Sequence, residues 1–89
     1  MLITGNHVWL NEEFVPATIE IEGNRIKQII RKKTKQAIDY GDHYIIPGLI
    51  DIHTHGYQGG GAADGDAAFL KKWAHYYVKE GVTTFLVGI

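Results

Sequence analysis

Residues 47–56 read PGLIDIHTHG, an apolar run that ends in two histidines one residue apart and then a glycine. If residues 49–55 form a strand, side chains at i and i+2 share a face, so His53 and His55 project together from its C-terminal end. Two neutral imidazoles side by side suit a divalent metal that accepts nitrogen ligands, such as zinc, iron or nickel. The segment therefore predicts a metal site at the tip of a strand. The alternative is that both histidines make ordinary hydrogen bonds to neighbouring loops.

The overall charge of the chain argues against polyanionic partners. Its 89 residues include nine basic and ten acidic side chains and no cysteine, and the net charge is −1. This balance gives no support for nucleic acid as a partner, and the lack of cysteine excludes disulfides and thiolate–metal sites. The start of the chain is neither basic nor followed by a long apolar stretch. We therefore expect no signal peptide and no membrane span, and we expect the protein to be cytoplasmic.

The first part of the chain, residues 1–46, is typical of β-structure. Two short apolar runs at 8–10 and 14–15 flank the polar residues 11–13, which predicts a hairpin. Residues 31–35 carry four basic side chains. We interpret them as a solvated strand end rather than an anion site, because no aromatic residues or glycine-rich cradle accompany them.

Alternation between apolar and polar residues marks the next strand. Apolar side chains occupy every second position from 17 to 21, the pattern of a half-buried strand. The pair Gly23-Asn24 predicts a two-residue turn into a return strand over residues 25–30, with Ile26 and Ile30 on one face. Together these patterns predict a small antiparallel meander with one face exposed to water.

The pattern changes after residue 47. Leu49, Ile50 and Ile52 place apolar side chains on both faces, as expected for a parallel strand covered by protein on both sides. Asp66 is a good N-cap for a helix, and Gly81 stands where a left-handed glycine ends one. The apolar stripe of this helix is expected to comprise Leu70, Trp73, Ala74, Tyr77 and Val78. With a second strand over residues 82–87, the order predicts a βαβ unit that opens a larger α/β fold.

Three further features near the histidines can each be interpreted as functional or as purely structural. Asp51 has the strand parity of the histidines, so it either orients a metal ligand or pairs with backbone. The glycines at 56 and 59–61 either let the backbone approach a substrate or bind an anion through amide groups, or they belong to a flexible loop. Asp64 and Asp66 are interpreted as loop and capping residues rather than ligands.

The segment PGLIDIHTHG resembles the first-strand signature of the amidohydrolase superfamily, metal-dependent hydrolases on a (β/α)8 barrel. The glycine after the second histidine, the run at 59–61, the short helix and GVTTFL at 81–86 are most similar to N-acetylglucosamine-6-phosphate deacetylases. The resemblance implies an α/β chain of two parts. Residues 1–46 are expected to be an antiparallel segment of a β-sandwich, and residues 47–89 the first βαβ unit of an incomplete (β/α)8 TIM barrel.

The resemblance also implies a function. His53 and His55 are expected to bind zinc or iron, and no catalytic acid or base is expected within these 89 residues. The implied reaction deacetylates N-acetylglucosamine 6-phosphate to glucosamine 6-phosphate and acetate in a homo-oligomer, with the metal activating water. We expect the chain alone to be inactive, because a complete barrel needs about 250 residues. The alternatives are a cyclic amidase or deaminase of the same superfamily, and a non-enzymatic binding module that self-associates.

Overall fold

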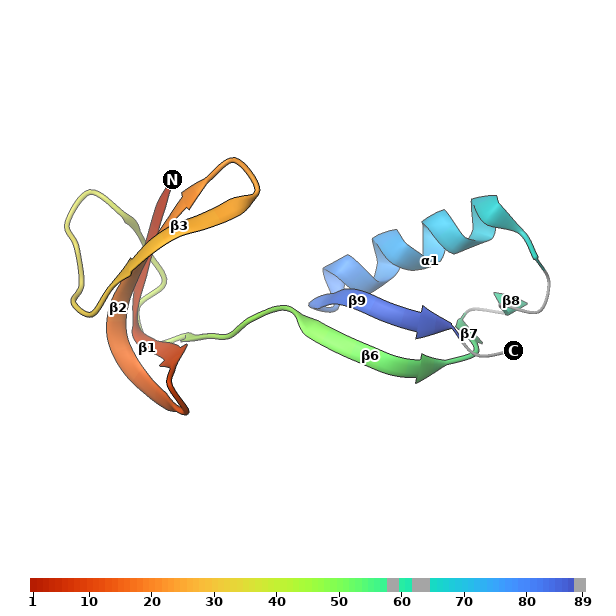
Figure 1. The fold of residues 1–89 in the computed structure, drawn as a ribbon, viewed down its shortest axis with the longest axis horizontal. Helices are drawn as coiled ribbons and strands as arrows, with labels where there is room; N and C mark the ends of the chain where they lie inside the picture. The colour runs from red at the N-terminus through yellow and green to blue at the C-terminus, as the bar shows by residue number, and fades with distance from the viewer. Residues whose placement is uncertain (58–59, 62–64, 88–89) are drawn as a thin grey trace. The chain divides into compact units, whose positions relative to one another are not determined.

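The computed structural model describes residues 1–57, 60–61 and 65–87, and it divides into two compact units (Figure 1). Unit 1 comprises Met1–Pro47 and unit 2 comprises Gly48–Ile89. Gly59 and Asp64, which were considered as loop residues above, lie outside the described residues. Within the described ranges, no helix has the length and apolar character needed to cross a membrane.

Unit 1 is a single mixed sheet. Its strands are β1 (Leu2–Leu10), β2 (Glu13–Glu22), β3 (Arg25–Ile30), β4 (Ile38–Asp39) and β5 (Tyr44–Ile45). The order is β3-β2-β1-β4, and β5 also pairs with β1. The first three strands are antiparallel, as predicted, but β4 and β5 both run parallel to β1. The prediction of a purely antiparallel meander is therefore wrong at this edge, because strands of two residues carry no periodic signal.

Both predicted hairpins are present in unit 1. Asn11 and Glu12 connect β1 to β2 with φ angles of 49° and 67°, the left-handed backbone of a tight two-residue turn. Gly23, with a φ of 61°, begins the turn from β2 to β3. Positive φ angles suit these connections because they match the twist of the flanking strands, so the turn residues set where each strand ends.

Two threonines are buried in the centre of the sheet, contrary to the predicted alternation. Thr4 and Thr18 are both fully buried, together with Val8 and Ala17. The hydroxyl oxygens of Thr4 and Thr18 lie 2.9 Å apart, and those hydroxyls also contact the carbonyl oxygens of Ala17 and Lys32, each at 2.8 Å. Thr18 is buried despite its polarity because these partners satisfy its hydrogen-bonding capacity.

A β-bulge changes which isoleucines of β3 share a face. Ile19 pairs with Ile29, but Ile21 pairs with Ile26, so β3 has one more residue than β2 in this interval. Ile26 therefore lies on the same face as Ile29, and the predicted pairing with Ile30 is wrong. This face borders an apolar cavity of about 270 Å³, which residues of β1, β2, β3 and β5 and the segment after β5 line together.

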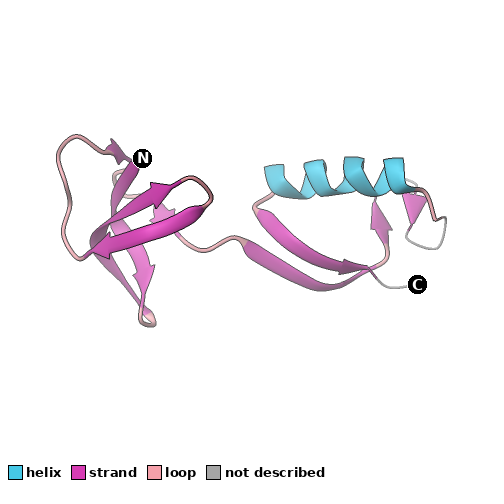
Figure 2. Ribbon diagram, turned by 45° about the horizontal axis from the view of Figure 1, so that its top comes forward, coloured by secondary structure: helices cyan, strands magenta, loops and turns pink. Residues whose placement is uncertain are grey.

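Unit 2 contains the expected strand, helix and parallel strand. They are β6 (Leu49–Thr54), α1 (Ala67–Lys79) and β9 (Val82–Val87), and β6 pairs with β9 in parallel. Two short strands, β7 (Gly56–Tyr57) and β8 (Gly60–Gly61), form a small antiparallel ladder within the glycine-rich stretch. Figure 2 shows α1 lying along one side of the β6–β9 pair.

The predicted ends of the helix are confirmed. The side chain of Asp66 accepts hydrogen bonds from the backbone N–H groups of Ala68 and Phe69, at 3.0 and 3.3 Å. Gly81 follows the helix with a φ of 86°, a conformation that disfavours residues with a Cβ.

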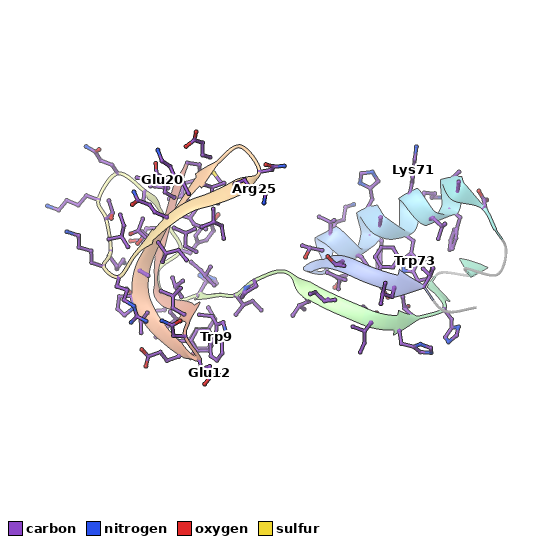
Figure 3. All side chains as sticks on the ribbon, in the orientation of Figure 1. Trp9, Glu12, Glu20, Arg25, Lys71 and Trp73 are labelled. Carbon is purple, nitrogen blue, oxygen red and sulfur yellow. The ribbon has the colours of Figure 1, made fainter. Side chains whose placement is uncertain are left out.

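One tryptophan forms the core of unit 2. Trp73 is fully buried, and its ring lies 5.1 Å from that of Phe85 on β9, so it points from α1 toward the strands (Figure 3). Val78, predicted on the same stripe, is 62% exposed because five residues of helix place it about 140° around from Trp73.

The outer face of β6 is open. Leu49, Ile50 and Ile52 are 50%, 65% and 73% exposed, respectively. A single helix covers only one face of the pair, and cover on both faces is predicted only within the larger α/β fold that this unit is expected to open.

Candidate metal centre

The two histidines meet at the C-terminal end of β6. The strand ends at Thr54, one residue before the predicted end, so His53 lies within it and His55 follows it. Their Nε2 atoms are 3.0 Å apart, and the rings stand nearly perpendicular with centroids separated by 4.7 Å. Both residues are exposed. The structure thus brings together the two side chains that the sequence singled out.

The spacing of the two nitrogen atoms is compatible with a shared metal ion. Zinc binds imidazole nitrogen at about 2.0–2.1 Å, so two nitrogens on a tetrahedral ion are about 3.4 Å apart. The observed 3.0 Å differs by only a few tenths of an ångström. Among the residues that the structure describes, no cluster of three or more His, Cys, Asp or Glu side chains could hold a metal. His53 and His55 therefore supply at most two ligands.

An irregularity in β6 lies directly beside the pair. Asp51 pairs with Phe85 and Thr54 pairs with Val87, so β6 advances three residues where β9 advances two. The extra residue shifts the alternation, so side chains after the bulge point to the face opposite to the one that regular alternation predicts. Asp51 and Thr54 consequently both contact Tyr77 of α1.

The carboxylate of Asp51 is engaged by backbone and by helix α1. One oxygen accepts the backbone N–H of His53 at 3.1 Å, and the other accepts the hydroxyl of Tyr77 at 3.0 Å. The carboxylate of Asp51 thus pairs with backbone, and the N–H group that it accepts belongs to the candidate ligand His53. Asp51 contacts the main chain of His53 rather than an imidazole.

Two of the remaining histidines have partners within unit 1. His7 lies 4.0 Å from the carboxylate of Asp42, and His43 Nδ1 lies 2.8 Å from the carbonyl oxygen of Tyr40, all within unit 1. His75 is exposed on α1. Asp66 acts as the helix N-cap, as predicted.

Two of the four basic side chains at 31–35 pair with acidic neighbours. Lys33 forms an ion pair with Asp39 at 2.9 Å, and Arg31 lies 3.6 Å from Glu13. Lys33 and the backbone N–H of Gly41 lower the pKa of the Asp39 carboxyl below its ordinary value. The structure therefore agrees with a solvated strand end in this segment.

Sequence reasoning missed the hydroxyl group of Tyr77. The residue was interpreted only as part of the apolar stripe of the helix, yet its hydroxyl contacts both Asp51 and Thr54. One signal was available, because a tyrosine on the covered face of a helix normally needs a polar partner for its hydroxyl.

Comparisons with known proteins bear on the fold of the chain. No protein-family model matches the chain. A crystal structure of N-acetyl-D-glucosamine-6-phosphate deacetylase from Mycobacterium smegmatis superposes with a TM-score of 0.85 over 100% of this chain, at 24% identity. A point mutant of that enzyme in complex with N-acetyl-D-glucosamine-6-phosphate gives a TM-score of 0.84 over 98% of this chain, also at 24% identity. These likenesses establish the fold.

A curated protein shows a likeness in sequence. A probable allantoinase from Oryza sativa subsp. japonica is 34% identical over 67 residues, which cover 61% of this chain. The chain resembles the amidohydrolase superfamily. Both the deacetylase and the allantoinase are hydrolytic enzymes of that superfamily, so the resemblance expected from PGLIDIHTHG is confirmed. The chain spans only 24–26% of the deacetylase chains and 13% of the allantoinase.

Proposed function

We propose that this chain supplies two metal ligands to an amidohydrolase that deacetylates N-acetylglucosamine 6-phosphate. The observation that carries the proposal is the meeting of the His53 and His55 imidazoles at the end of β6. Its support comes from the fold, which matches a deacetylase solved with that sugar phosphate. Enzymes of this superfamily generally use divalent metals.

In this proposal each part of the chain has a distinct role. His53 and His55 hold zinc or iron, which when bound lowers the pKa of water and polarises the acetamide carbonyl. Residues 1–46 belong to a β-sandwich, and residues 47–89 form the first βαβ unit of a (β/α)8 barrel. The catalytic acid or base and the other ligands are supplied from outside this chain. The enzyme acts in the cytoplasm as a homo-oligomer.

The test measures acetate release from N-acetylglucosamine 6-phosphate by a protein that contains this chain within a complete barrel. His53→Asn and His55→Asn are expected to lower kcat/KM at least about 100-fold, because each removes a ligand. His75→Asn, at an exposed position of α1, is the matched control and is expected to keep full activity. The 89-residue chain alone is expected to release no acetate. Full activity in both ligand variants would overturn the proposed role of the histidines.

The allantoinase likeness supports a second candidate, hydrolysis of a cyclic amide. The same histidines then hold the metal, and only the substrate changes. Parallel assays of the complete protein with allantoin and with N-acetylglucosamine 6-phosphate separate the two activities. Turnover of allantoin alone would replace the deacetylase proposal while leaving the metal pair intact.

A further inference from the structure

The hydroxyl group of Tyr77 connects helix α1 to both sides of His53. It lies 3.0 Å from Asp51 Oδ2 and 3.0 Å from the hydroxyl oxygen of Thr54. Asp51 precedes His53 by two residues, and Thr54 is its immediate neighbour. A single phenol therefore contacts the strand just before and just after this histidine.

The direction of each hydrogen bond follows from the chemistry of the groups. An ionised carboxylate only accepts, so the one hydroxyl hydrogen of Tyr77 goes to Asp51. Thr54 must then donate its hydroxyl hydrogen to the oxygen of Tyr77. The other oxygen of Asp51 accepts the backbone N–H of His53 at 3.1 Å. The bonds form a continuous chain from Thr54 through Tyr77 and Asp51 to the main chain of His53.

This chain of hydrogen bonds coincides with the bulge in β6. The bulge lies between Asp51 and Thr54, the two strand residues that Tyr77 contacts. A bulged residue lacks a regular hydrogen-bonding partner on the neighbouring strand. Here the carboxylate of Asp51 accepts the hydrogen bond from the backbone N–H of His53. Tyr77 thus stabilises the local backbone that aims the imidazole of His53 at that of His55.

We propose that Tyr77 is a positioning residue, which orients His53 for metal binding through the carboxylate of Asp51. The proposal rests on the metal role of His53 and His55 given under Proposed function. Hydrogen-bonding partners behind metal ligands commonly change metal affinity by about 10- to 100-fold, and Tyr77 acts one bond further away. Its removal is therefore expected to weaken binding by about tenfold, at the lower end of that range.

The test titrates the 89-residue chain with Zn²⁺ and follows the imidazole signals of individual histidines by NMR. His75 and His43, which are distant in sequence, serve as internal controls within each titration. Tyr77→Phe removes the hydroxyl but keeps the ring, which packs 5.0 Å from Phe85. Tyr44→Phe is the matched control, because it removes an exposed hydroxyl from unit 1. Hydrogen exchange at the His53 amide gives a second readout that does not depend on metal.

In Tyr77→Phe we expect the Zn²⁺ midpoint at His53 and His55 to rise about tenfold and the His53 amide to exchange faster. Amide exchange within β9 and helix α1 is expected to stay unchanged, which separates positioning from a loss of fold. Thr54→Val, which removes only the donor to Tyr77, is expected to give a smaller shift of the same sign. An unchanged Zn²⁺ midpoint in Tyr77→Phe overturns the positioning role and leaves the metal pair standing.

The same experiment separates failure of the metal pair from failure of this inference. If Zn²⁺ shifts His53 and His55 of the unaltered chain no more than His75, the proposed metal pair is overturned. The His53 amide then decides the role of Tyr77 by itself. Faster exchange in Tyr77→Phe supports positioning of the backbone, and exchange equal to that of Tyr44→Phe overturns it.

Discussion

The two units bury their interiors in different ways. In unit 1 the fully buried side chains include two threonines, whose hydroxyls lie within hydrogen-bonding distance of each other and of backbone carbonyl oxygens. In unit 2 the buried side chain is Trp73, which lies among the aromatic rings of α1 and β9. Unit 1 therefore depends on a polar network of several groups, whereas unit 2 depends on one large apolar side chain.

The comparison also concerns what each unit leaves exposed. Strand β1 of unit 1 has strands on both sides, because β4 and β5 occupy the edge opposite β2. Among the described residues of unit 2, strand β6 has β9 as its single neighbour, and Ile50 and Ile52 on it are exposed. Strand β6, which carries the histidine pair, is therefore less enclosed by neighbouring strands than β1 is. Its geometry relies on a few specific contacts to α1.

The largest expected effect is in unit 2. Trp73→Ala is expected to lower its free energy of unfolding by about 3–5 kcal/mol, because it leaves a cavity at the only fully buried side chain described there. Amide hydrogen exchange in β9 and β2 reports the two units separately, and β2 is expected to remain protected. Val78→Ala, at an exposed position of the same helix, is the control. An equal loss of amide protection in β9 and β2 would contradict the expectation that the two units unfold separately.

The polar interior of unit 1 gives the next effect. Thr18→Val keeps the shape of the side chain but leaves its buried partners without a hydroxyl, at a cost of about 1–3 kcal/mol. Urea unfolding followed by the fluorescence of Trp9, with Trp73 replaced by Phe in all variants, measures the change. Thr84→Val, at an exposed position of β9, is the control. An unchanged midpoint in Thr18→Val would show that the hydroxyl network contributes no stability.

A smaller effect concerns the start of α1. Asp66→Ala is expected to destabilise unit 2 by about 1 kcal/mol, because the N–H groups of Ala68 and Phe69 lose their acceptor. Asp66→Asn keeps an acceptor and is expected to retain most of the stability. Amide exchange at Ala68 and Phe69 checks both variants. Unchanged exchange at these two amides in Asp66→Ala would contradict the capping role.

The smallest effect is a pH dependence confined to unit 1. Lys33 and the N–H of Gly41 lower the pKa of Asp39 below its ordinary value of 3.8. A group with a lowered folded pKa stabilises the protein above its unfolded pKa, and this contribution is lost as pH falls through the folded value. NMR titration of the Asp39 carboxyl is expected to show a higher pKa in Lys33→Gln. A pKa unchanged by that substitution would remove Lys33 as the cause.

Local signals in the sequence predicted local structure well. The turn after β2, the Asp66 cap and Gly81 all depend on backbone and side-chain groups within a few residues, and the structure confirms them. Predictions that required distant partners were less successful. The burial of Thr18 depends on Thr4, fourteen residues away, and the parallel pairing of β4 and β5 depends on the free edge of β1. The metal role of His53 and His55 stays a prediction.

The sequence by itself determined the order of the longer strands and the helix and the place of the histidine pair, because turn, cap and apolar patterns act over a few residues. Only the tertiary structure decided which side chains share a face. Alternation along a strand holds until a bulge inserts one residue, and pairing with another strand decides where that happens. In β6 that pairing is with β9, more than thirty residues later in the chain. Asp51 there contacts Tyr77, and the imidazoles of His53 and His55 lie side by side.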